Sequence, residues 1–111
     1  ANGSLTLGEN IADHGGLQVS YQAFKKATAA APLEVKDGFT PEQRFFLAYA
    51  NVWANNTRPE AILQLTKIDV HSLGKWRVDA ALPHIAAWYE AFGITEKDPM
   101  FVPVAERISI W

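Results

Sequence analysis

The stretch that most constrains the fold is residues 5–16, which read LTLGENIADHGG. Glu9 and Asp13 are four residues apart, and side chains at that spacing lie on one face of a helix. The same face continues through Leu17, Tyr21 and Phe24, which are typical core residues. Carboxylates on a buried face are costly unless a cation compensates them. We therefore expect both acids to point inward, beside either a metal ion or an arginine.

Taken without their surroundings, these two carboxylates have a simpler interpretation. The dipole of a helix favours acidic side chains in its N-terminal part. The spacing of Glu9 and Asp13 alone therefore favours a structural role over a metal site.

The rest of the pattern is helical. A first helix is predicted from about Thr6 to Ala30, and the glycines at 15 and 16 inside it indicate a close approach or a kink. Residues 32–38 form a loop. The sequence TPEQ at 40–43 predicts a capping box with proline at the first helical position, so a second helix runs to about Ala54. Its wide apolar arc predicts burial on most sides.

Two further helices complete the predicted fold. Arg58-Pro59 opens a third helix that ends near Ile68, and Leu82-Pro83 opens a fourth that stops at Gly93. Residues 98–111 contain two prolines and β-branched side chains, which predict an extended tail with one short strand. The predicted fold class is mainly α, with about four helices joined by short loops.

Composition excludes several classes of function. The chain of 111 residues has 49% hydrophobic residues and a formal charge of −2, so it can bury a core and offers no electrostatic basis for binding nucleic acid. It has no cysteine, which excludes a disulfide framework and a thiolate metal site. No apolar run reaches the roughly 18 residues of a membrane span.

Four blocks, in order, carry a family resemblance. They are residues 7–13 (LGENIAD) with two glycines at 15 and 16, residues 45–53 (FFLAYANVW), residues 69–72 (DVHS) with Arg77-Val78, and the final Ile110-Trp111. Together they resemble the C-terminal part of the neprilysin-type zinc metalloendopeptidases, a family with endothelin-converting-enzyme-like and bacterial oligopeptidase members. The resemblance implies the C-terminal part of a thermolysin-like (gluzincin) catalytic domain.

The resemblance implies a role for four residues. Glu9 matches the third zinc ligand, and Asp13 matches the carboxylate that holds a zinc-binding histidine. His71 matches the histidine that stabilises the oxyanion of the tetrahedral intermediate, and Arg77 matches an arginine that binds substrate backbone. These residue types suit that chemistry, because an oxyanion needs a positioned donor and a guanidinium fork binds carbonyl or carboxylate oxygens. Gly74 between the last two permits a turn.

Half of such a site is missing from residues 1–111. Zinc peptidases of this kind take two ligands from a His-Glu-x-x-His helix, and no two of His14, His71 and His84 have that spacing. We therefore expect an incomplete segment of a catalytic domain. The full-length enzyme would hold one zinc ion and cleave short peptides, whereas this segment alone would hold no zinc and be inactive.

The other histidines have structural interpretations. Neighbours in a helix point about 100° apart, so His14 does not share the face of Glu9 and Asp13, and we expect a surface or helix-contact residue. His84, just after Pro83, is expected to be structural. His71, without the resemblance, would be a solvent-facing turn residue. Leu73 and Trp76 depart from the proline and phenylalanine that relatives often carry.

Partners and compartment follow from the same reasoning. Four Trp, three Tyr and six Phe exceed what so short a chain buries, so part of the surface should pack on the remainder of the catalytic domain, and the isolated segment should self-associate. Animal members of the family that the chain resembles carry cysteines in this region, so the resemblance and the lack of cysteine imply a bacterial-type relative, in the periplasm, the cell envelope or the cytoplasm. The alternative is a non-catalytic helical interaction module whose buried carboxylates pair with arginine or lysine.

Overall fold

A computed structural model describes residues 2–110. Its helices are α1 (Gly3–Ala29), α2 (Pro41–Val52), α3 (Pro59–Ile68), α4 (Gly74–Asp79) and α5 (Ala86–Phe92), with short 3-10 helices η1 (Leu82–His84) and η2 (Val104–Glu106). Within residues 2–110 the only β-type pairing is an isolated bridge between Lys36 and Phe39. The predicted mainly α class is confirmed.

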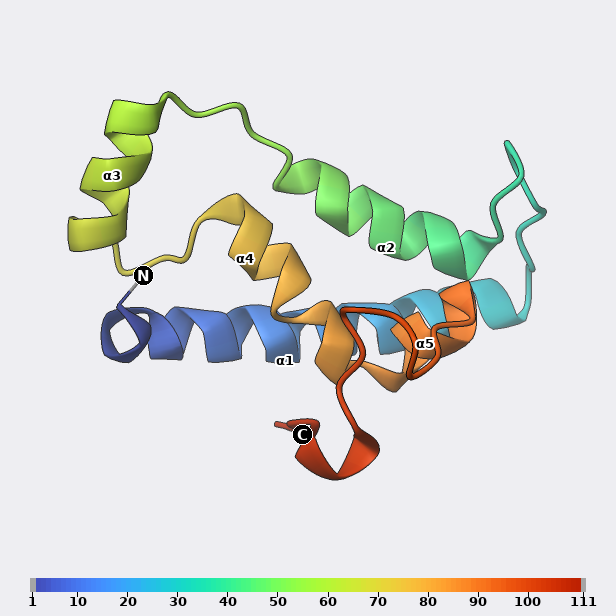
Figure 1. The fold of residues 1–111 in the computed structure, drawn as a ribbon. Helices are drawn as coiled ribbons and strands as arrows, with labels where there is room; N and C mark the ends of the chain where they lie inside the picture. Colours follow the sequence, from blue (N-terminus) through green and yellow to red (C-terminus); the bar gives the residue numbers. More distant parts are fainter. Residues whose placement is uncertain (1, 111) are drawn as a thin grey trace.

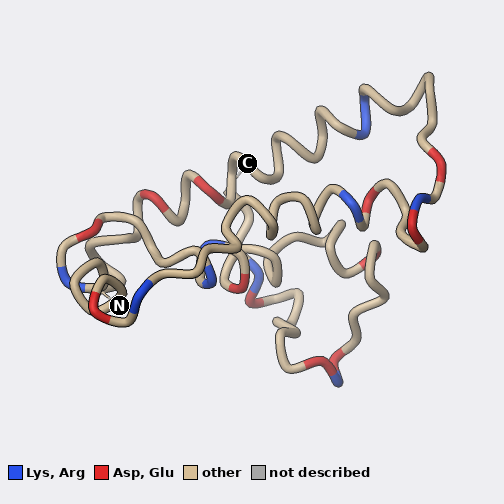
Figure 2. The backbone as a smooth tube through the Cα atoms, turned by 90° about the horizontal axis from the view of Figure 1, so that it is seen from above, with Lys and Arg blue, Asp and Glu red and all other residues tan. Residues whose placement is uncertain are grey.

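The long helix α1 runs along most of the molecule. In Figure 1, α2, α3 and α4 lie above α1, α5 lies towards its C-terminal end, and the end of the chain lies below it. Acidic and basic residues are spread along the chain in Figure 2 and form no stripe of one sign. No helix within residues 2–110 combines the length and the hydropathy needed to cross a bilayer.

The hydrophobic core lies between the second half of α1, α2, η1 and α5. Leu17 and Phe46 are buried there, and Phe46 is the most buried large side chain, with 1% of its surface exposed. The ring of Tyr21 stacks on Phe46 at a centroid distance of 5.3 Å. The remaining core members are Leu82, Ile85, Trp88 and Tyr89. The core therefore lies on the C-terminal side of Asp13.

Helix α1 begins three residues earlier than predicted, because the side chain of Asn2 caps it by accepting from the backbone N–H of Leu5 at 3.2 Å. It continues without interruption through Gly15 and Gly16. A Cβ built on Gly16 would meet nothing within 4 Å among the described residues. The described residues thus make no close approach at Gly16, whereas Gly15 is buried.

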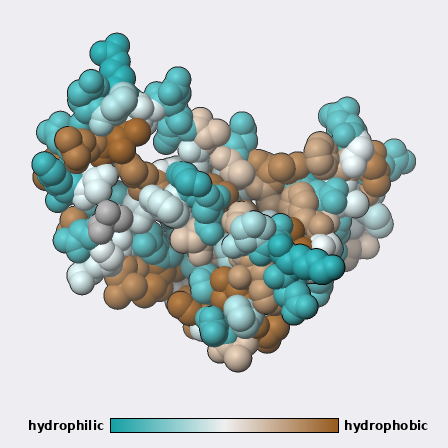
Figure 3. All heavy atoms as spheres, in the orientation of Figure 1, coloured by the Kyte–Doolittle hydropathy of each residue, from teal (hydrophilic) through white to brown (hydrophobic). Residues whose placement is uncertain are grey.

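Helix α2 has the predicted capping box. The N–H of Gln43 donates to the Thr40 hydroxyl at 3.1 Å, and the N–H of Thr40 donates to the Gln43 side chain at 3.0 Å. The prediction that this helix is buried on most sides is wrong for the described residues. Leu47 and Val52 are exposed, whereas Phe45 and Phe46 pack against Tyr21 of α1 and, for Phe46, Phe92 of α5. Other apolar side chains reach the surface over α3 (Figure 3), including Ile62, Leu63 and Ile68.

The region after α3 differs most from the prediction. Helix α4 was not predicted, and the fourth predicted helix is divided into η1 and α5 by the extended backbone of Ile85. Its end at Gly93 is confirmed, in the left-handed region with φ 63°. The predicted strand in the tail is absent from the described residues. Instead, the N–H of Val102 donates to the hydroxyl of Tyr89 at 2.9 Å, so the tail bonds to a side chain of α5.

Candidate functional site

The cation expected beside the two acids is an arginine in the case of Asp13. Nε and Nη2 of Arg77 each donate to one Asp13 carboxylate oxygen, and both donor–acceptor distances are 2.6 Å. The two side chains are only 15% and 16% exposed. The hydrogen bonds that Arg77 donates to Asp13 raise the pKa of Arg77, so the guanidinium stays charged. Helix α4, which was not predicted, therefore brings Arg77 onto the first predicted helix.

The guanidinium is also fixed from the side of α2. It lies over the ring of Trp53, 3.7 Å from the centroid, and the hydroxyl of Tyr49 donates to the Arg77 carbonyl at 2.9 Å. A Cβ built on Gly74 would lie 2.5 Å from the carbonyl oxygen of Trp53, so only glycine allows α4 to start this close to α2. The arrangement thus holds the Arg77 guanidinium in one orientation.

Glu9 and His71 form the second part of the site. Nε2 of His71 lies 3.4 Å from Oε2 of Glu9, whose side chain is 46% exposed. Within the residues that the structure describes, Asp13 points inward as expected, whereas Glu9 is about half exposed. The Asp69 carboxylate accepts from the backbone N–H of His71 at 2.9 Å and contacts its Nδ1 at 3.0 Å. These bonds lower the pKa of Asp69. The His71 ring is thereby oriented with Nε2 towards α1.

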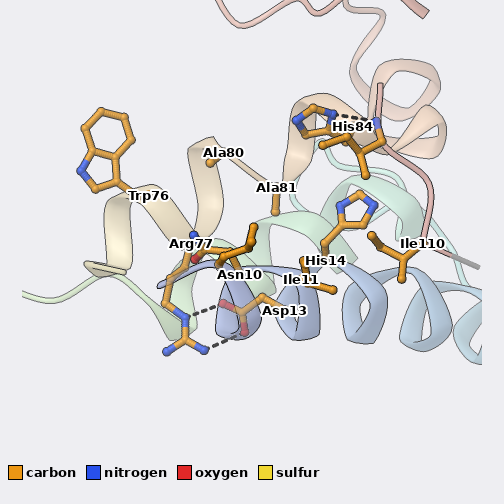
Figure 4. Close-up of a pocket in the computed structure, with 12 residues that line it drawn as sticks. Asn10, Ile11, Asp13, His14, Trp76, Arg77, Ala80, Ala81, His84 and Ile110 are labelled. Atoms are coloured by element: carbon orange, nitrogen blue, oxygen red, sulfur yellow. Dashed lines mark hydrogen bonds and ion pairs between the residues drawn. The ribbon is translucent and has the colours of Figure 1, made fainter. Parts of the chain in front are cut away.

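Of the cavities that adjoin these residues, two are lined by Arg77. One, of about 490 Å³, is lined by Trp53, His71 and Arg77 together with residues 55–57 and 72–76. The other, of about 180 Å³, lies between α1, α4 and the tail (Figure 4) and is lined by Asp13, Arg77, His14 and His84 among others. Arg77 lines both cavities. The structure thus brings His71 and Arg77 to one cavity and Asp13 and Arg77 to its neighbour.

We expected His14 to be either a surface residue or a helix-contact residue, and it is the latter. It is 6% exposed, and its ring meets that of His84 edge-on at 5.9 Å. Burial and the neighbouring His84 lower the pKa of His14. His84 accepts at Nδ1 from the N–H of Ile108 at 3.1 Å. This supports the expected structural role of His84, which anchors the tail.

Sequence reasoning missed a polar link beside the site. The hydroxyl of Ser72, next to His71, donates to the Asn10 side-chain oxygen at 2.8 Å, and Asn10 follows Glu9. The two residues are 62 positions apart, and no spacing rule connects them. The only indication of them in the sequence is that Asn10 follows Glu9 and Ser72 follows His71, both of which are candidate site residues.

Residues 2–110 contain no group of three or more His, Asp or Glu side chains placed to hold a metal ion. Glu9 is a half-exposed carboxylate with one neighbouring imidazole. By itself this donor set does not fit a zinc site, which takes at least three protein ligands. Glu9 can contribute one ligand to a site that other residues complete.

Comparison with known proteins gives the family. The model of peptidase family M13 matches residues 1–108. Human membrane metallo-endopeptidase-like 1 is 41% identical over 113 residues, which cover 99% of this chain and 14% of that protein. Human neprilysin is 42% identical over 94 residues, 82% of this chain and 12% of neprilysin. The chain thus spans about one seventh of the length of such relatives.

A solved structure agrees. The zinc metalloprotease Zmp1 of Mycobacterium tuberculosis, determined in an open state and in complex with an inhibitor, matches 98% of this chain and 17% of its own with a TM-score of 0.93 and 34% identity. The helical fold described above is that of the C-terminal part of an M13 protease domain. The family resemblance is confirmed, and the chain belongs to peptidase family M13, the family of neprilysin.

Proposed function

We propose that this chain supplies the third zinc ligand and the oxyanion- and substrate-binding residues of a zinc metalloendopeptidase that cleaves oligopeptides. One observation carries the proposal. In a chain of family M13, an imidazole and a guanidinium line the same cavity, and the imidazole lies 3.4 Å from the carboxylate of Glu9.

Glu9 is the proposed metal ligand. Its exposed carboxylate leaves its oxygens accessible to a metal ion held by two further ligands from outside residues 1–111. Zinc, when bound, would polarise a water molecule and the scissile carbonyl. In this proposal the general base also lies outside this chain, and the chain alone binds no zinc and is inactive.

His71 is the proposed oxyanion donor. Its ring is oriented by Asp69 on the Nδ1 side, which leaves Nε2 on the side of Glu9 and the cavity. A donor held in this way stabilises charge that develops on a carbonyl oxygen without having to reorganise first. Such an interaction strengthens in the transition state and therefore raises kcat.

Arg77 and Asp13 have the capacity for their proposed roles even though they are bonded to each other. A guanidinium has five N–H donors, and Asp13 takes two of those of Arg77, so three are left for substrate carbonyl or carboxylate oxygens. A carboxylate has about four acceptor positions. Asp13 can therefore accept from Arg77 and also orient a zinc-binding histidine, which is worth about 10- to 100-fold in metal affinity or activity.

The test is Glu9→Gln in the full-length enzyme, with zinc measured by elemental analysis on the purified protein and hydrolysis measured on a short fluorogenic peptide. We expect loss of stoichiometric zinc and of activity. Arg77→Lys is the matched control, because it should keep the zinc while it raises KM. Stoichiometric zinc in the Glu9→Gln protein would refute the assignment of Glu9.

The non-catalytic interaction module remains a second candidate, and one observation favours it. Asp13 meets an arginine within this chain, as that alternative expects of its carboxylates. The same zinc measurement separates the two candidates. An unmodified full-length protein without zinc and without hydrolysis of any peptide would favour the module.

A further inference from the structure

A directional chain of hydrogen bonds runs from the loop at residues 69–73 into α1. The hydroxyl of Ser72 donates to Oδ1 of Asn10 at 2.8 Å, and Nδ2 of Asn10 donates to the hydroxyl of Thr6 at 3.3 Å. That hydroxyl donates in turn to the carbonyl of Asn2 at 3.2 Å. The one proton of the Thr6 hydroxyl is donated to the Asn2 carbonyl, so this hydroxyl accepts from Asn10 and the Asn10 amide has a single orientation. The chain of bonds ends on the backbone of the residue that caps α1.

This link is better protected than the other polar contact between the same elements. Among the side chains of residues 2–110, the loop meets α1 through two polar contacts, Ser72 with Asn10 and His71 with Glu9. The His71 and Glu9 side chains are about half exposed, and exposed pairs of this kind contribute little and are screened by salt. The Ser72–Asn10 bond is partly buried and rests on Thr6, which is itself buried.

The position of the link suits a role in the reaction. Asn10 directly follows Glu9, and Ser72 directly follows His71, so one bond fixes the backbone next to both groups. A carboxylate that serves as a metal ligand has less charge to offer a neighbouring imidazole. The bond between Ser72 and Asn10 does not depend on that charge.

We propose that Asn10 and Ser72 are positioning residues, which hold the loop on α1 so that the imidazole of His71 stays beside Glu9. The inference rests on the proposed function for its catalytic consequence. The geometric part, that the bond places His71, stands independently of it.

The first test is kinetic. Ser72→Ala in the full-length enzyme should lower kcat about 10- to 100-fold, the range found when a supporting hydrogen bond or about 1 Å of placement is lost. KM and zinc content should change less than about twofold, because the bond serves an interaction of the transition state. Ser72→Thr keeps a hydroxyl and should restore kcat. Thr28→Ala is the matched control, since it removes a hydroxyl that donates to the Phe24 carbonyl near the other end of α1.

The second test does not need activity. In the 111-residue chain, nuclear Overhauser contacts between the His71 ring and the Glu9 side chain should be present, and Ser72→Ala or Asn10→Ala should remove them while the core signals stay unchanged. The double variant should be no worse than either single one, because both remove the same bond. If the contacts persist in both single variants, the inference is overturned. If they disappear and kcat is unchanged, the link is upheld and the proposed role of His71 is refuted.

Discussion

Replacing Asp13 by asparagine tests how much the ion pair with Arg77 stabilises the fold. The substitution keeps the size of the side chain and removes its charge. Each of the two hydrogen bonds is charge-assisted, and such bonds contribute about 1.5–3 kcal/mol. Breaking a fully buried pair costs about 3–5 kcal/mol. The pair is 15–16% exposed and asparagine can still accept one of the bonds, so we expect a loss near the lower end, about 2–3 kcal/mol.

The assay is urea unfolding of the chain, followed by far-ultraviolet circular dichroism and by tryptophan fluorescence. A loss of that size corresponds to a fall in Tm of roughly 10–20 °C for a domain of this length. Because folding raises the pKa of Arg77, the charged guanidinium stabilises the fold fully at any pH below the ordinary pKa of arginine, which is already high. This stabilisation is lost only at still higher pH. The loss should therefore be the same at pH 6 and pH 9.

The matched control is Glu42→Gln, which breaks the exposed pair between Glu42 and Lys25. An exposed pair is worth about 0–1 kcal/mol, so this variant should unfold almost as the unmodified chain does. If Asp13→Asn costs less than about 0.5 kcal/mol, or no more than the control, then the Arg77 pair does not stabilise the fold and the reasoning fails.

Three further predictions follow from described contacts. Gly74→Ala should destabilise the chain by about 1–3 kcal/mol, because its Cβ would clash with the Trp53 carbonyl. Gly16→Ala, where a Cβ meets nothing within 4 Å, should stabilise α1 by about 0.5–1 kcal/mol. Thermal melts of both variants show whether Tm falls for the first and rises for the second. Tyr89→Phe should cost about 1–3 kcal/mol in urea unfolding, because the buried Pro83 carbonyl and the partly buried Val102 N–H lose their partner; an unchanged midpoint would contradict this. Folding lowers the pKa of His14, so below the ordinary pKa of histidine the unfolded state binds more protons than the folded state. The free energy of unfolding should therefore fall between pH 7.5 and pH 5.5. His14→Asn should reduce that fall in urea titrations at the two pH values.

The fold was predictable where local rules govern it. The capping box at Thr40, the proline that opens α3 and the glycine that ends α5 are signals carried by adjacent residues. Helix α4 was missed because six residues are too few for an apolar period, and Leu73 before it supplies no side-chain cap. Contacts with α2 stabilise it instead, and such contacts are invisible in the sequence.

The site was predictable in part for the same reason. The spacing of the acids indicated a cation, and Arg77 is the cation that Asp13 meets. The partial exposure of Glu9 was not predictable. The spacing of residues on a helix shows which of them share a face, but not which other elements cover that face at each residue. The proposed roles of His71 and Arg77 came from family motifs, whereas their common cavity depends on how α4 packs.

The two halves of α1 are attached to the rest of the molecule by different kinds of contact. Its second half contributes Leu17 and Tyr21 to the apolar core, whereas Glu9 and Asp13 belong to a half attached mainly through polar contacts. Amides in residues 5–12 should therefore exchange with solvent through local openings of lower free energy than those in residues 17–24. The placement of Glu9 beside His71 and the global stability of the fold are thus separable quantities, and substitutions that alter the first can leave the second unchanged.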